Sequence, residues 1–281
     1  MNAAAGTLSR LSRPGAWLPA TVLVAASYLL FFWPALVSLV GDWASSGEYG
    51  HGFLMAPLAV WLAAKRMTAG ADPARTGGLV LVGFAVCAFL FGSLAGELFT
   101  QRLGALVALA GLAVYYRGWS QLAAWWLPFA LLASAVPLPD MVLDTLTLPL
   151  QLLASDAAVW LLQARHIPAG QAGNVIFLPG HELFVAAACS GLRSISALLG
   201  LTILIAGTYV TAPLARVCLV VLAVPAAIAA NVVRVFATGF LVYYFGAGAA
   251  TGLMHHAMGA VAFVLPLALI AFTAWALERT E

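Results

Sequence analysis

The chain has 281 residues, of which 64% are hydrophobic and 8% are charged, and its net charge is +2. Soluble domains typically carry about 25% charged residues, so this composition excludes a soluble globular protein and predicts a polytopic membrane protein. We interpret residues 1–281 as one membrane domain without a separate soluble domain. The basic residues form no patch and no P-loop occurs, so the sequence indicates no nucleic acid partner.

The first apolar run, residues 16–40, follows Arg10 and Arg13. It is longer than the apolar core of a signal peptide, which has about 7 to 15 residues, so we expect a retained helix with a cytoplasmic N-terminus. Residues 41–51 contain two acidic residues and neither lysine nor arginine, which predicts an extracytoplasmic loop.

Seven further apolar runs predict additional membrane spans. They cover residues 52–64, 79–95, 103–116, 121–136, 190–209, 217–245 and a last helix that begins at His255. With these spans, eight of the twelve basic residues lie on the cytoplasmic side, as the positive-inside rule requires: Arg10, Arg13, Lys65, Arg66, Arg75, Arg117, Arg216 and Arg279.

Residues 146–163 are apolar but also carry Pro149, Gln151 and Asp156. This pattern fits an amphipathic helix at the membrane interface. If the segment spanned the membrane instead, Cys189 would lie on the cytoplasmic side; we prefer the interfacial interpretation because the downstream charges then fit. The predicted fold is therefore all-α, with about eight transmembrane helices and one interfacial helix.

Cys189 opens the span at residues 190–209 and is a candidate nucleophile. A thiol attacks as a thiolate, whose pKa falls at a helix N-terminus or near a cation. We expect a helix that begins near Cys189, with Ser190 among its first residues and Arg193 one turn away on the same face. The alternative is a small apolar cysteine packed among helices. Cys87 and Cys218 lie in other spans, so neither is placed to pair with Cys189.

Arg234 lies roughly 27 Å along its helix from Arg216, near the outer boundary of a hydrocarbon core about 30 Å thick. An arginine at that depth is costly and marks a functional candidate, although a snorkelling or structurally paired arginine is the alternative. Asn231, three residues earlier on the same face, is placed to orient the guanidinium. His255, at the start of the last helix, is either a third reactive group or a hydrogen-bonded cap.

Five segments of the sequence resemble the exosortase/archaeosortase family. Three are signature blocks: Cys189-Ser190-Gly191-Leu192-Arg193, Asn231-Val232-Val233-Arg234 and His255-His256-Ala257-Met258-Gly259. Two more are Tyr49-Gly50-His51-Gly52 and the run from Gly173 to Pro179. The resemblance extends over about residues 49–265.

The resemblance implies a cysteine peptidase or transpeptidase with three catalytic residues. Cys189 is the nucleophile, Arg234 stabilises the oxyanion and His255 is the general acid and base. The histidine of the family stands four residues before a glycine, so Gly259 selects His255 over His256. Supporting roles fall to Arg193, Asn231, Ser190 and His256, and Tyr49 and His51 are candidates for the substrate cleft.

The implied substrates are exported proteins with a C-terminal tail, which consists of a short motif such as PEP, one transmembrane helix and a basic cluster. Such an enzyme is a multi-pass protein of the inner membrane with its site on the periplasmic side. A thioester acyl-enzyme is resolved by a glycan, a lipid or water, and no metal or other cofactor is implied. Larger members carry a C-terminal soluble domain, so this chain resembles a minimal member.

Two other functions remain open on the sequence. A serine intramembrane protease would use Ser190, and a transporter would explain the apolar helices and Arg234 without chemistry. A zinc protease is disfavoured because no H-E-x-x-H motif occurs.

Overall fold

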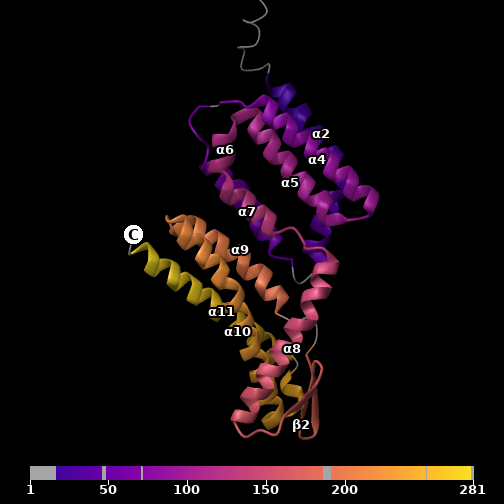
Figure 1. The fold of residues 1–281 in the computed structure, drawn as a ribbon, viewed down its shortest axis with the longest axis vertical. Coiled ribbons are helices and arrows are strands. Elements are labelled where there is room, and N and C mark those ends of the chain that lie inside the picture. Colours follow the sequence, from indigo (N-terminus) through magenta and orange to yellow (C-terminus); the bar gives the residue numbers. More distant parts are fainter. Residues whose placement is uncertain (1–16, 46–48, 71, 186–190, 251, 280–281) are drawn as a thin grey trace, which may run out of the picture.

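The computed structural model describes residues 17–45, 49–70, 72–185, 191–250 and 252–279. Cys189 and Ser190 lie outside these ranges. The helices shown in Figure 1 are α2 (Trp17–Ser45), α3 (Gly52–Lys65), α4 (Arg75–Ala95), α5 (Leu98–Arg117), α6 (Trp119–Ala124), α7 (Trp126–Ser134), α8 (Asp140–Ala164), α9 (Leu192–Tyr209), α10 (Pro213–Phe245) and α11 (Gly252–Glu278), with a short 3-10 turn η3 (Ala247–Ala250) before α11.

Six helices in the described ranges are long and apolar enough to cross a membrane: α2, α4, α5, α8, α10 and α11. The chain is therefore a mostly helical, polytopic membrane protein, whereas eight spans are not confirmed. The second predicted span is α3, whose 14 residues reach only about 21 Å and thus less than a hydrocarbon core of about 30 Å.

The predicted span at residues 121–136 is broken into two helices, α6 and α7, that meet at Trp125. Pro128 explains the break: it has no amide N–H, and its ring would clash with the carbonyl of Ala124, the last residue of α6. The prediction of one continuous helix was wrong here because it followed the apolar run and gave no weight to Pro128.

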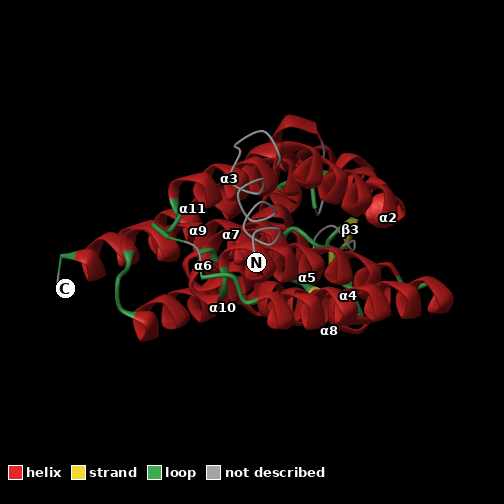
Figure 2. Cartoon of the chain, turned by 90° about the horizontal axis from the view of Figure 1, so that it is seen from above, coloured by secondary structure: helices red, strands yellow, loops and turns green. Residues whose placement is uncertain are grey.

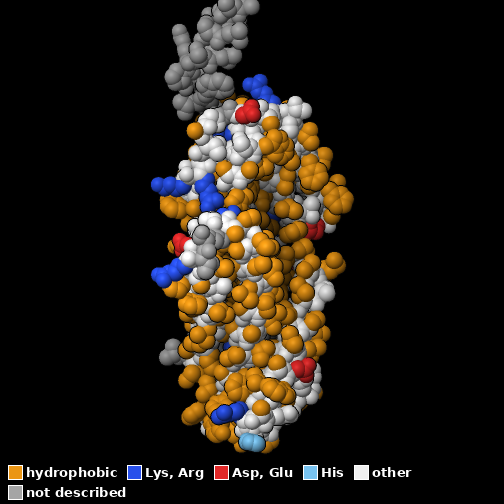
Figure 3. All heavy atoms as spheres, turned by 60° about the vertical axis from the view of Figure 1, so that its left-hand side comes forward, with side chains coloured by type: hydrophobic (Ala, Val, Ile, Leu, Met, Phe, Trp, Pro, Cys, Tyr) orange, Lys and Arg blue, Asp and Glu red, His pale blue; other side chains and the backbone are white. Residues whose placement is uncertain are grey.

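Basic side chains tie several helix ends together at one end of the bundle. Arg66, after α3, donates to the carbonyl of Gly207 at 2.9 Å, and Arg216 donates to the carbonyl of Val210 at 2.6 Å. Both guanidinium groups lie over the ring of Trp126. Figure 3 shows that the visible surface between the few charged groups is mainly hydrophobic. Arg66 and Arg216 are among the residues that the positive-inside rule predicts on the cytoplasmic side, and that side stays a prediction.

Acidic residues mark the opposite ends of α2, α4 and α5. Arg102, on α5, is 4% exposed and forms a salt bridge of 2.7 Å with Asp42 near the end of α2. Glu97 caps the start of α5, and Asp140 starts α8 close by, where both line the same hollow as Asp42.

Residues 170–184 fold into a three-stranded antiparallel sheet, drawn in yellow in Figure 2. Its strands are β1 (Gly170–Ala172), β2 (Val175–Leu178) and β3 (His181–Phe184). Two-residue turns join them, and Gly173 and Gly180 adopt the positive φ angles, 60° and 75°, that such turns require. The all-α prediction was therefore incomplete, because it assigned no strand to the apolar run Val175–Leu178.

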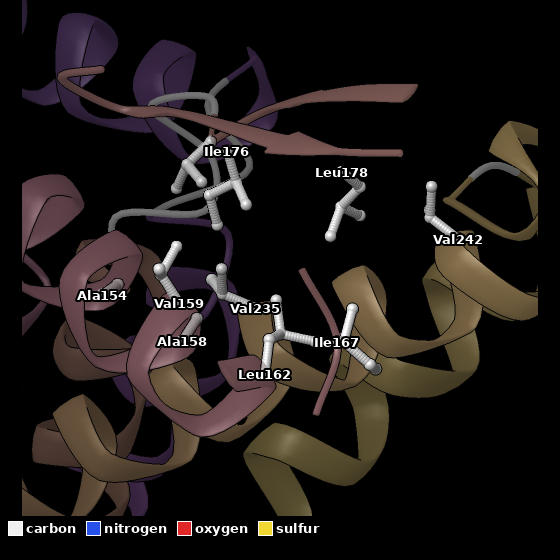
Figure 4. Packing of buried hydrophobic residues seen from close by; sticks show 10 residues of the cluster. Ala154, Ala158, Val159, Leu162, Ile167, Ile176, Leu178, Val235 and Val242 are labelled. Carbon is white, nitrogen blue, oxygen red and sulfur yellow. The ribbon is translucent and has the colours of Figure 1, made fainter. Parts of the chain in front are cut away.

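Helix α8 packs lengthwise against α10 and runs in the same direction. Leu143 and Leu150, early in α8, share a hollow with Val224 of α10, whereas Leu162 near its end lies against Gly239. The sheet covers this pair: Ile176 and Leu178 of β2 point toward the helices in Figure 4 and complete the buried cluster listed in its caption.

Candidate active site

Helix α9 begins at Leu192, because Gly191 is its N-cap residue and has a left-handed conformation with φ of 87°. A left-handed residue cannot belong to the helix. The described helix therefore begins three residues after Cys189, and the prediction that places Ser190 in its first turn falls on residues outside the described ranges. Arg193 is the second residue of α9; its side chain is outside the described atoms, so its predicted proximity to Cys189 stays a prediction.

Gly191 lies directly against Asn231 of α10. A methyl group on Gly191 would lie 3.1 Å from both Cβ and Cγ of Asn231, which is 4% exposed. The close approach requires glycine at this position as much as the backbone angle does. The start of α9 is thereby fixed to α10 two residues after Cys189.

Arg234 lies one turn beyond Asn231 on α10 and reaches α11. Its Cζ is 4.0 Å from the position that a Cβ on Gly259 would occupy. Gly259 comes one turn after His255, which is in the first turn of α11. The described residues thus bring α9, α10 and α11 together at one level, while the side chains of His255 and His256 are outside the description.

A groove with a volume of about 520 Å³ runs between α10 and α11 and contains Arg234. Its other described lining residues are uncharged and include six alanines, and they extend from Met254 and Ala237 at the Arg234 end to Ala226 and Leu269. The groove therefore presents one cation at one end of an otherwise apolar surface.

A second hollow of about 530 Å³ lies on the other side of α10, among α7, α8 and α9. Tyr49 lines it together with Leu192 and Ile228. Tyr49 also lines a third, more polar hollow of about 660 Å³ between the acidic helix ends, and its hydroxyl accepts a hydrogen bond from the amide of Leu138 at 3.2 Å. This placement is compatible with the predicted role of Tyr49 in a substrate cleft.

The segment from Tyr49 to Gly52 is also a packing junction. His51 Nε2 is 3.3 Å from the carbonyl of Ser134 on α7. A Cβ on Gly52 would overlap the indole of Trp43, whose Nε1 donates to the carbonyl of Ala135 at 2.8 Å. The glycine thus allows α2, α3 and α7 to meet, which gives this motif a structural function beside any role in binding.

A profile of transmembrane exosortases matches residues 43–272, which is most of the chain. The chain belongs to the transmembrane exosortase family. No curated protein and no solved structure matches it. Membership implies a role in sorting proteins with PEP-type C-terminal signals, an activity generally attributed to cysteine transpeptidases.

Two site residues of this exosortase escaped sequence reasoning. Gly191 was considered only as part of a block, although its contact with Asn231 fixes the start of α9. Gly259 was used only to choose between two histidines, although Arg234 lies against it. Nothing in the residue types signals these contacts, because they depend on how three helices meet. In the described ranges, no three His, Cys, Asp or Glu residues are grouped to hold a metal ion.

Proposed function

We propose that this exosortase cleaves the C-terminal sorting tail of exported proteins at the outer face of the inner membrane. The Cys189 thiolate attacks the scissile carbonyl carbon and forms a tetrahedral adduct, whose oxyanion Arg234 stabilises. When the C–N bond breaks, His255 donates a proton to the leaving amine, and a thioester remains on Cys189. An amine, a hydroxyl or water then displaces the thiolate.

The convergence of three helix segments is the observation that carries this proposal. Asn231 contacts Gly191, and Arg234 contacts Gly259. The covalent chain keeps the Cα of Cys189 within about 7 Å of that of Gly191. Arg234 and the segments that carry the cysteine and the histidine therefore belong to one neighbourhood, as an acyl-transfer site requires.

The direction of α8 supports an extracytoplasmic site. Helix α7 leads from Trp126, at the basic end, to Ser134, near the acidic ends. Helix α8 continues beside the outer half of α10 in the same direction, so it does not lead back to the basic end. Residues 165–185 then lie on the same side as the acidic loops, although α8 packs lengthwise along α10 instead of lying flat at the interface as the sequence led us to expect.

Processing of a tagged protein with such a tail tests the proposal. We expect Cys189→Ala to abolish processing, because no thioester can form, and Ser190→Ala to retain it. Arg234→Ala should lower kcat by roughly 10²–10³-fold, which is the effect of losing one oxyanion donor. Arg234→Lys keeps the charge but loses the planar guanidinium, so its kcat should lie between those of the wild type and Arg234→Ala. Gel shift and mass spectrometry of the new C-terminus report the cut.

Membrane expression of each variant is the control for misfolding. Wild-type cleavage by Cys189→Ala combined with loss in Ser190→Ala would instead establish the serine protease alternative. Full processing in every variant would contradict the proposed mechanism.

A further inference from the structure

We infer that the groove between α10 and α11 seats the transmembrane helix of the substrate tail while the bond beside Arg234 is cut. The inference rests on the proposed function and specifies where its substrate binds. Helices α10 and α11 lie side by side over their length, and the groove follows their contact line.

The groove has the direction that a substrate tail requires. In the proposed reaction the scissile bond lies at Arg234, and the apolar helix that follows it must descend through the bilayer toward the cytoplasm. From Arg234 the groove follows α10 back to Ala226, toward the end of α10 that is held at Arg216. Eleven residues separate Ala226 from Ala237 at its two ends, which corresponds to roughly 16 Å of helix.

The chemistry of the groove fits a helix. Six of its lining residues are alanines: Ala226, Ala229, Ala230, Ala237, Ala257 and Ala262. Small residues let helix backbones approach closely in lipid, where packing rather than hydrophobicity drives association. Among the described lining residues Arg234 alone is charged, so the polar end meets the backbone near the scissile bond while the other described lining residues offer apolar side chains.

Filling the groove should weaken the binding of substrates that have a transmembrane helix and leave unchanged the cleavage of substrates that lack one. We expect Ala230→Leu and Ala262→Leu to raise KM at least tenfold for a full tail with little change in kcat. A short peptide that carries the motif without the helix should be cut as fast as by the wild type. Ala260→Leu and Ala268→Leu are matched controls, because both alanines are exposed on α11 outside the groove lining.

Disulfide crosslinking tests the occupant directly. The protein carries Ala262→Cys together with Cys87→Ala, Cys218→Ala and Cys189→Ala, and the substrate helix carries one cysteine at each position in turn. We expect adducts that recur every three or four substrate positions, and none of that pattern with Ala260→Cys. A covalent homodimer, or equal adducts from both protein positions, would overturn the inference and leave the groove to a second copy or to lipid.

The two ideas fail separately. If Cys189→Ala processes substrate normally, the proposed function is wrong. If Cys189→Ala is inactive while the groove variants and their controls all match the wild type on the full tail, the function stands and the docking site is wrong.

Discussion

At the scale of single residues, two glycines decide how the candidate site is built. Gly191 combines a positive φ with contact to Asn231, and Gly259 leaves the space that the Arg234 guanidinium faces. A Cβ at Gly191 would crowd Asn231, whereas a Cβ at Gly259 would make an ordinary van der Waals contact with Arg234. The site thus depends on close backbone approach as well as on reactive groups.

Replacing Gly191 with alanine should damage the site more than the fold. The left-handed conformation costs an alanine roughly 1–2 kcal/mol, and the added methyl group would press on Asn231. We expect processing to fall at least tenfold while the protein still inserts and unfolds cooperatively in detergent. Gly83→Ala is the control, because Gly83 is in α4 with nothing within 4 Å of the added Cβ. Equal processing by Gly191→Ala and the wild type would contradict this account of the helix start.

The sequence identified candidate residues better than it predicted how they are arranged in space. Arg234 could be singled out because a charge near a span is costly. By contrast, the expectation that one helix carries both Cys189 and Arg193 assumed a helix that continues through Gly191, whereas Gly191 is the left-handed N-cap residue of α9. A glycine in sequence does not reveal the sign of its φ angle, so the start of α9 could not be found this way.

At the scale of elements, the start of α5 shows how one carboxylate holds a helix end. Glu97 Oε1 accepts from the amide of Phe99 at 2.8 Å, and Oε2 accepts from the amide of Thr100 at 2.6 Å. Partial burial opposes ionisation, but these hydrogen bonds and the charge of Arg102 outweigh it, so the pKa of Glu97 lies below its ordinary value.

The stability that Glu97 contributes should therefore depend on pH. A lowered folded-state pKa means that the contribution is complete above the unfolded-state pKa of 4.5 and is lost as pH falls through the folded value. We expect Glu97→Gln to lower the free energy of unfolding at pH 7 by about 0.3–1 kcal/mol, which thermal unfolding in detergent measures. The difference from the wild type should shrink as pH falls below 4.5 and through the lowered folded-state pKa of Glu97.

Glu182→Gln is the matched control, because Glu182 is exposed on β3. A destabilisation by Glu97→Gln that stays constant over the whole pH range would show that the charge at this cap is irrelevant.

Element positions followed from hydropathy, but element continuity did not. Helices α4, α10 and α11 lie where apolar runs predicted them. The break at Trp125 and the sheet at residues 170–184 were missed, because a single proline interrupts a helix within a long apolar run and two short turns allow the chain to form strands. Both misses concern local backbone rules that average hydropathy does not register.

At the scale of the whole molecule, the two ends of the bundle differ in charge, and α8 determines which end the sheet joins. Basic contacts at Arg66 and Arg216 gather at one end, whereas Asp42 and Glu97 mark the other. The sheet follows α8 beyond the acidic helix ends. The end of the bundle at which the sheet lies therefore depends on the direction of α8 as well as on the membrane spans.

Cysteine labelling in intact cells checks this topology. In a background of Cys87→Ala, Cys218→Ala and Cys189→Ala, Ala172→Cys on β1 should react with a membrane-impermeant maleimide. Ala69→Cys, between α3 and α4, should react only after permeabilisation; both alanines are exposed. Protection of Ala172→Cys until permeabilisation would identify α8 as a true span and reverse the side assigned to the site.

The length of α10 has a consequence for the membrane around it. Its 33 residues reach about 50 Å, well beyond a hydrocarbon core of about 30 Å. Part of the helix can therefore lie in water while the rest crosses the hydrocarbon core. Arg234 lies roughly 27 Å from Arg216, at a depth that a slightly thicker bilayer would submerge. We expect acyl chain length thereby to set how much water surrounds the guanidinium, and through it the rate of the proposed reaction.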